Sequence, residues 1–163
     1  MTFTATKPKN VETNNGIAWA TTIKFNGVVC AHISNDGRGA CDDHEWVDKT
    51  YIDQFIAEAD KLNGDGSDGN LYSGFDKKDH RGQPGADFCA PLVEKLMQEA
   101  ENAAARAAQL KRDCKKHICA LMPGKDHSKG YTIFKNCQPT VALVARLRNE
   151  YSGIKILNPG VEA

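Results

Sequence analysis

Two cysteines and a histidine are the residues in the first third of the chain best suited to bind a metal. Cys30, His32 and Cys41 are expected on adjacent strands with their side chains on one sheet face, and Asp43 or His44 could supply a fourth ligand. Zinc prefers four tetrahedral ligands of this kind. The chain has no Cys-x-x-Cys pair, so the alternative is that both cysteines are small packing residues. We expect no cofactor, with zinc as the alternative.

Two further cysteines are candidates for a nucleophile. Cys89 and Cys137 each lie near the expected start of a helix, where the helix dipole can lower the pKa of a thiol. A cysteine that packs in the first turn of a helix gives the same pattern. A small cysteine-dependent hydrolase or transferase is therefore an alternative function, and packing is the favoured interpretation.

Two loops look like ligand-binding motifs, but their spacing is wrong. Residues 123–130 contain Gly, Lys and Ser, yet they lack the Gly-x-x-x-x-Gly-Lys-Ser/Thr order of a phosphate-binding loop. Residues 63–74 place oxygen-bearing side chains at alternate positions. Asp68 stands where a calcium loop of the EF-hand type needs glycine, and Gly74 stands where it needs glutamate. The sequence therefore predicts neither site.

Charge is unevenly distributed along a chain whose formal net charge is zero. Residues 36–101 hold 16 acidic and 7 basic residues, a net charge of −9, and residues 103–135 have a net charge of +6. The basic segment is a candidate nucleic-acid surface, with Tyr131 and Phe134 nearby for stacking. Its candidate contact residues are Arg106, Lys111, Arg112, Lys115, Lys116, Lys125 and Lys129. The alternative is that cations gather here because a helix C-terminus attracts them.

The expected N-terminal element is an antiparallel β-meander. Asn26-Gly27 between two β-rich runs favours a two-residue turn that pairs Phe25 with Val28 and Ile23 with Cys30. The same register pairs Thr21 with His32 and Trp19 with Ser34. A second turn at Asp36-Gly37 would place Ile33 opposite Ala40 and His32 opposite Cys41, and the meander should end near Trp46. Residues 1–15 form either a flexible arm or an edge strand.

The rest of the chain predicts helices and short strands. The expected elements are a helix over 49–62 capped by Asp48, a long loop over 63–86, a helix over 89–114, strands over 117–122 and 131–135, a helix over 139–151 and a strand over 154–157. The long helix carries a near-heptad stripe that could form a homodimer. Together these elements predict one α+β domain over residues 1–163, with a meander, a long central helix and a C-terminal β-hairpin, helix and strand.

Composition sets the expected environment. The chain has no apolar run long enough to span a membrane, and its first 15 residues are polar, unlike a secretory signal. We therefore expect a cytoplasmic protein whose six cysteines are free thiols or metal ligands.

Residues 34–41, Ser-Asn-Asp-Gly-Arg-Gly-Ala-Cys, resemble a motif of small uncharacterised proteins encoded by phages and plasmids. The long charged helix and the short strands that follow it also look similar. The resemblance implies an accessory protein of a mobile element, a class that includes inhibitors of CRISPR systems, and it assigns no site residues.

The leading hypothesis is a non-enzymatic protein that binds and inhibits a host macromolecule, such as a CRISPR-type defence complex. The expected partner is a host protein or ribonucleoprotein, in the cytoplasm of the host cell. The alternatives are a zinc-stabilised nucleic-acid-binding protein and the cysteine-dependent enzyme.

Overall fold

The computed structural model describes residues 2–64, 74–126 and 130–160, and it shows an α+β fold. The chain divides into two compact units, Met1–Ala104 (unit 1) and Ala105–Ala163 (unit 2), and the helix α2 (Ala86–Asp113) runs from one into the other. The expectation of one domain over 1–163 stays a prediction. No helix in the described part of the chain is long and apolar enough to cross a membrane.

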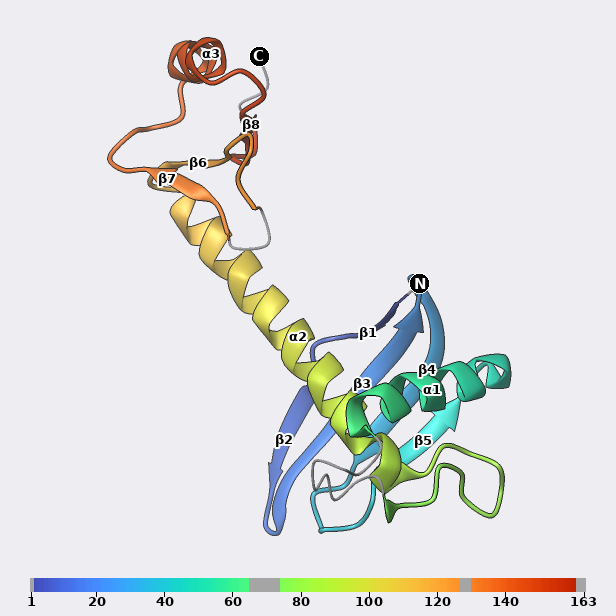
Figure 1. Cartoon of the computed structure of the whole chain (residues 1–163). Coiled ribbons are helices and arrows are strands. Elements are labelled where there is room, and N and C mark those ends of the chain that lie inside the picture. The colour runs from blue at the N-terminus through green and yellow to red at the C-terminus, as the bar shows by residue number, and fades with distance from the viewer. Residues whose placement is uncertain (1, 65–73, 127–129, 161–163) are drawn as a thin grey trace. The chain divides into compact units, whose positions relative to one another are not determined.

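Unit 1 is built on a five-stranded antiparallel sheet (Figure 1). Its strands are β1 (Phe3–Ala5), β2 (Lys9–Thr13), β3 (Gly16–Phe25), β4 (Val28–Asn35) and β5 (Asp43–Trp46). Both β1 and β2 pair with β3, at opposite ends of that long strand. Residues 1–15 therefore supply edge strands, which confirms the second of the two expectations for this segment.

The turn at Asn26-Gly27 is confirmed, and the register beyond it is corrected by one residue. Both turn residues have positive φ, 49° and 87°, as this type of turn requires. Phe25 pairs with Val28 as predicted, but a β-bulge then places Ile23 opposite Ala31 and not Cys30. The thiol of Cys30 donates to the carbonyl of Ile23 at 3.4 Å. An extra residue in one strand turns Cys30 and Ala31 both toward the core, which an unbroken alternation cannot do.

The same shift moves the other predicted pairs. His32 lies opposite Thr22 and not Thr21, and Trp19 lies opposite Asn35 and not Ser34. The second turn is a loop over residues 36–42 and not a tight hairpin, so on β5 the partner of His32 is Glu45 and not Cys41. Ile33 likewise lies opposite His44 and not Ala40.

Helix α1 (Ile52–Asn63), preceded by the 3₁₀ turn η1 (Lys49–Tyr51), and the first part of α2 pack on the sheet. Asp48 caps η1 as predicted, because its carboxylate accepts from the amide of Thr50. Phe55 of α1 is fully buried, with its ring 5.1 Å from Phe3 and 5.4 Å from Trp46. From α2 the buried residues are Phe88, Cys89, Leu92, Val93 and Leu96.

The long helix begins three residues before the predicted start at Cys89 and ends one residue before Cys114. Along its expected apolar stripe, Leu92 and Leu96 are buried in unit 1, whereas Ala103 and Ala107 are exposed. A homodimer through this helix stays a prediction.

Unit 2 is a three-stranded antiparallel sheet in the order β7-β6-β8, packed on one helix. Its elements are β6 (Ile118–Leu121), β7 (Thr132–Phe134), α3 (Val141–Glu150) and β8 (Lys155–Ile156). Thr140 caps α3, so this helix begins after Pro139 and not at it. Asn158 closes the unit: its side chain accepts from the amide of Cys119 and donates to the carbonyls of Cys114 and His117.

Candidate binding site

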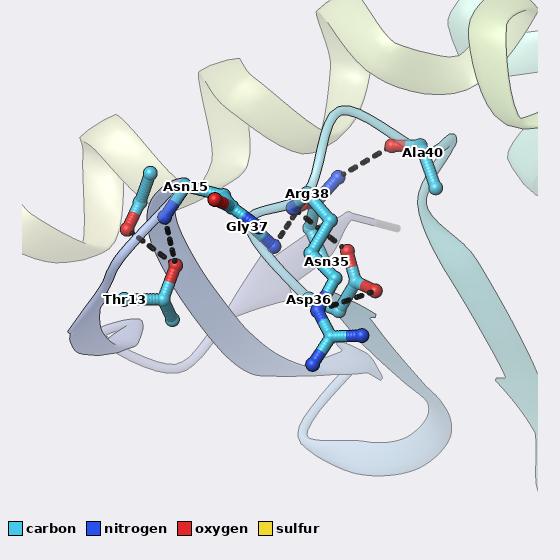
Figure 2. Close-up of polar contacts among 8 residues, drawn as sticks. Thr13, Asn15, Asn35, Asp36, Gly37, Arg38 and Ala40 are labelled. Atoms are coloured by element: carbon cyan, nitrogen blue, oxygen red, sulfur yellow. Dashed lines mark hydrogen bonds and ion pairs between the residues drawn. The ribbon is translucent and has the colours of Figure 1, made fainter.

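The motif that follows β4 forms a loop held by its own side chains (Figure 2). The carboxamide oxygen of Asn35 accepts from the amide of Gly37 at 2.8 Å, and a carboxylate oxygen of Asp36 accepts from the amide of Arg38 at 2.9 Å. These are two successive turns of the kind that Asn and Asp favour, because a short polar side chain reaches the backbone two residues on. The motif is therefore accounted for by backbone geometry.

Gly37 places this loop directly against the start of β3. Its φ is +73°, and a Cβ at this position would lie 2.7 Å from the amide nitrogen of Ala18 and from the carbonyl carbon of Ile17. A Cβ on Gly16 would in turn lie 2.8 Å from the carbonyl oxygen of Gly37. Two glycines thus permit a backbone contact that no other residue pair allows.

The side-chain amide of Asn35 connects the loop to the segment that precedes β5. Its nitrogen donates to the carbonyl of Ala40 at 3.0 Å and to the carboxylate of Asp42 at 2.9 Å. The side chain of Asp42 is thereby fixed in position just before β5. The loop thus positions the carboxylate of Asp42.

Asp42 lies at a cavity of about 380 Å³ in unit 1, which we call the acidic cavity. One wall is the end of the motif loop and the start of β5, and the other is the segment before α2 together with its first turn. The lining residues with ionisable side chains are Cys41, Asp42, Asp43, His44, Asp76, Lys78, Asp79, Arg81 and Asp87. Acidic groups outnumber basic ones, so the cavity favours a cation.

The two basic side chains of the cavity are already paired with carboxylates. Lys78 lies 2.6 Å from a carboxylate oxygen of Asp53, and the Nε atom of Arg81 lies 3.1 Å from Asp79. By contrast, Asp42, Asp43 and Asp87 form no ion pair with any residue in the described ranges. Asp76 likewise has no ion pair there, so four carboxylates of the lining lack a cation.

Burial shifts the pKa of two groups in the cavity. It raises the pKa of Asp42, and the hydrogen bond from Asn35 partly offsets this. Burial also lowers the pKa of His44, against the attraction of Asp42, Asp43 and Asp79. Both ring nitrogens of His44 are buried, and neither has a hydrogen-bond partner among the described residues. A buried polar atom without a partner is costly, so the imidazole has an unmet demand for a hydrogen bond.

Cys41 is not activated as a nucleophile. Its thiol lies 3.5 Å from one carboxylate oxygen of Asp87 and 3.7 Å from the other. The negative charge and the hydrogen bond of Asp87 raise the pKa of the thiol, whereas a reactive cysteine needs a lowered pKa. The lining therefore offers carboxylates that can bind a cation, and its thiol is not activated as the nucleophile of a cysteine-dependent enzyme would be.

The structure does not bring the predicted zinc ligands together. Cys30 is fully buried in the core, His32 is exposed and bonds the hydroxyl of Thr22 at 3.1 Å, and Cys41 lies at the cavity. Within residues 2–64, 74–126 and 130–160, no three His, Cys, Asp or Glu side chains are grouped closely enough to hold a metal ion. The β-bulge turns Cys30 and His32 to opposite faces of the sheet, and the loop over 36–42 keeps Cys41 off the strand that pairs with His32.

The two cysteines considered as nucleophiles lie in different units. Burial raises the pKa of the Cys89 thiol to about 12, which suits a packing residue. Cys137 is half-buried and packs against the core of unit 2. The loop over 63–74, considered for calcium, falls largely outside the described residues.

Most of the candidate basic residues are exposed. Arg106, Lys111 and Arg112 lie on α2, Lys115 and Lys116 in the turn after it, and Lys125 in the loop after β6. Lys129 lies outside the described residues. Tyr131 and Phe134 are half-buried, and the hydroxyl of Tyr131 donates to Asp113 at 2.7 Å. The expected stacking aromatics are thus engaged within the protein.

Sequence reasoning found part of the cavity. It named Cys41, Asp43 and His44 as possible metal ligands, and it marked the loop over 63–86, whose end supplies the second wall. It missed Asp42 and Asp87, because nothing local indicates that these carboxylates meet. The one available signal was the length of that loop, since loops without regular structure are often functional.

Comparison with known proteins yields no relative of this chain. No protein family model matches it, and neither does any curated protein or solved structure.

Proposed function

We propose that this chain is a non-enzymatic binding protein whose acidic cavity receives a cationic side chain from the basic surface of a partner protein. The observation that carries the proposal is the cavity itself, whose lining combines four carboxylates without ion pairs and an imidazole without a hydrogen bond among the described residues.

The chemistry favours a guanidinium group over a simple ammonium. A guanidinium offers five donors in a planar fork, and carboxylates accept two of them in parallel. Asp42 and Asp87 stand on different elements of the lining, the segment before β5 and the first turn of α2. Neutral His44 is an additional acceptor. A bound guanidinium would thus satisfy charges and a buried imidazole that the protein leaves without partners.

The charge of the whole unit supports the same partner. Residues 1–104 hold 17 acidic and 10 basic residues, a net charge of −7. Such a field attracts a basic surface before contact and speeds association at low ionic strength. The cavity then supplies a local point of recognition within a generally acidic surface.

The test uses a short peptide with one arginine and the same peptide with citrulline, an uncharged analogue of arginine. Isothermal titration calorimetry of the full chain should detect the arginine peptide and give at least tenfold weaker binding for citrulline. Asp42→Asn should reduce arginine binding at least tenfold, because it removes one carboxylate and keeps the shape. Asp36→Asn is the matched control, since this exposed acid lies outside the cavity lining. Equal binding of both peptides, or an equal loss in the control, would overturn the proposal.

The partner proposed from the motif resemblance is a bacterial defence complex of the CRISPR type. Expression of the chain in cells that target a phage should raise the number of plaques by orders of magnitude, and the double variant Asp42→Asn, Asp87→Asn should abolish the rise. An unchanged plaque number across several CRISPR types would remove this partner and leave the guanidinium site to the calorimetry.

A further inference from the structure

The border between the two compact units is also the border between acidic and basic sequence. Residues 105–163 hold 11 basic and 4 acidic residues, a net charge of +7, against −7 for the rest of the chain. Such an excess of basic residues in a small unit favours binding of an anionic partner.

The lysines at the end of α2 are not neutralised by their neighbours. Lys111, Lys115 and Lys116 are exposed, and none forms an ion pair with another residue in the described ranges. The acid beside them, Asp113, accepts from the hydroxyl of Tyr131 at 2.7 Å and from the side-chain amide of Gln109 at 2.9 Å. Its carboxylate is thus held by uncharged donors, and the lysine ammonium groups remain available.

The attraction of cations by a helix C-terminus explains only some of this charge. The helix dipole acts within the last turn, where Lys111 and Arg112 lie. Lys125 and Lys135 are exposed in segments after β6 and β7, and Lys155 is exposed on β8. Basic side chains on several elements of one unit require a cause beyond the helix.

The aromatic residues of unit 2 determine how a nucleic acid would be recognised. Stacking of bases needs an exposed ring. Tyr131 is half-buried with its hydroxyl bonded to Asp113, and Phe134 packs with its ring 6.3 Å from that of Tyr151, within the core cluster. These rings therefore pack within unit 2 and are not presented for stacking on bases.

We infer that unit 2 binds the phosphate backbone of nucleic acids, through the lysines at the end of α2, without reading base sequence. Because contact is made with phosphates and not with bases, a duplex binds more tightly than a single strand, in line with its higher charge density. This site is separate from the acidic cavity and does not rest on the function proposed for it.

The experiment is fluorescence anisotropy of the full chain with a labelled 20-base-pair DNA duplex of mixed sequence, from 50 to 200 mM salt. The affinity should fall with salt, and the triple variant Lys111→Gln, Lys115→Gln, Lys116→Gln should bind at least tenfold more weakly at 50 mM. The slope of log affinity against log salt should also become shallower, by about 0.9 for each lysine that contacts a phosphate.

The matched control is a triple glutamine variant of Lys7, Lys9 and Lys49, three exposed lysines of unit 1. It changes the net charge by the same amount and should keep the wild-type affinity within about twofold. An equal loss in this control would show that net charge alone acts and would overturn the inference. So would a salt-independent affinity, a tenfold preference between two duplex sequences, tighter binding of the single strand, or equal binding to vesicles that contain phosphatidylserine.

The two proposals fail separately. Asp42→Asn should leave duplex binding unchanged, and the lysine variant should leave binding of the arginine peptide unchanged.

Discussion

Replacement of Gly37 by alanine tests whether the motif over residues 34–41 acts through its backbone. Gly39 is the matched control, because it lies two residues away in the same loop and has a φ of +84°, close to the +73° of Gly37. A Cβ on Gly39 meets nothing within 4 Å, whereas a Cβ on Gly37 meets two backbone atoms of β3 at 2.7 Å. The two substitutions therefore share the conformational cost and differ in the steric one.

The magnitudes follow from these two terms. An alanine in the left-handed region costs about 1–2 kcal/mol, of which about 0.4–1 kcal/mol is returned because the unfolded chain is less flexible. We expect Gly39→Ala to lower the free energy of unfolding by about 1 kcal/mol. For Gly37 the two shortest new contacts, at 2.7 Å, lie well inside the ordinary limit of 3.4 Å, against backbone that cannot rotate away. Overpacking of this kind adds about 1–3 kcal/mol, for a total of about 2–4 kcal/mol.

Urea unfolding followed by tryptophan fluorescence is the assay. The chain has 2 tryptophans, Trp19 and Trp46, and both lie in unit 1, so the signal reports the unit that contains the loop. Binding of the arginine peptide adds a functional measurement, because displacement of the loop should also release Asn35 from Asp42. If Gly37→Ala proved no more destabilising than Gly39→Ala, the close approach of the loop to β3 would be wrong.

Three other perturbations test single contacts. Asp87→Asn should speed alkylation of Cys41 at pH 8, measured by peptide mass spectrometry, because loss of the neighbouring charge lowers the pKa of the thiol; Asp43→Asn should not. Asn158→Asp should destabilise unit 2 by about 2 kcal/mol or more, seen as faster amide exchange in β6, because two carbonyls lose their donor. Burial lowers the pKa of His44 below its usual 6.5, so the folded state takes up fewer protons than the unfolded state as the pH falls. Unit 1 should therefore lose stability below about pH 6.5, and His44→Gln should remove that part of the pH dependence.

The parts of the fold that the sequence predicted are those specified locally. Asn26-Gly27 defines its turn because two adjacent positions need positive φ, and Asp48 defines a cap because its side chain reaches an amide two residues on. Helix and strand positions in unit 2 follow from periodicity and differ from expectation by one or two residues at their ends.

The register errors came from contacts that are distant in sequence. The bulge at Cys30 is favoured because it buries Cys30 and Ala31 together beneath α1 and α2, and no property of the strand alone reveals that. The prediction that Cys30 and His32 share a face failed for this reason, and with it the arrangement expected for zinc. Asp42 and Asp87 meet at one cavity across 45 positions of sequence, through packing of α2 on the sheet.

The motif and the cavity are linked by a single side chain. The carboxamide oxygen of Asn35 accepts from the amide of Gly37 and closes the turn. Its nitrogen donates to the carbonyl of Ala40 and to the carboxylate of Asp42. Substitution by Asp would keep the acceptor and replace the donor with a negative charge beside the buried carboxylate. The pKa of Asp42 would then rise further, and the cavity would lose its best-oriented anion while the loop kept its turn. Asn35 therefore does two things that Asp could do only in part: it closes the turn at Gly37 and it orients the carboxylate of Asp42.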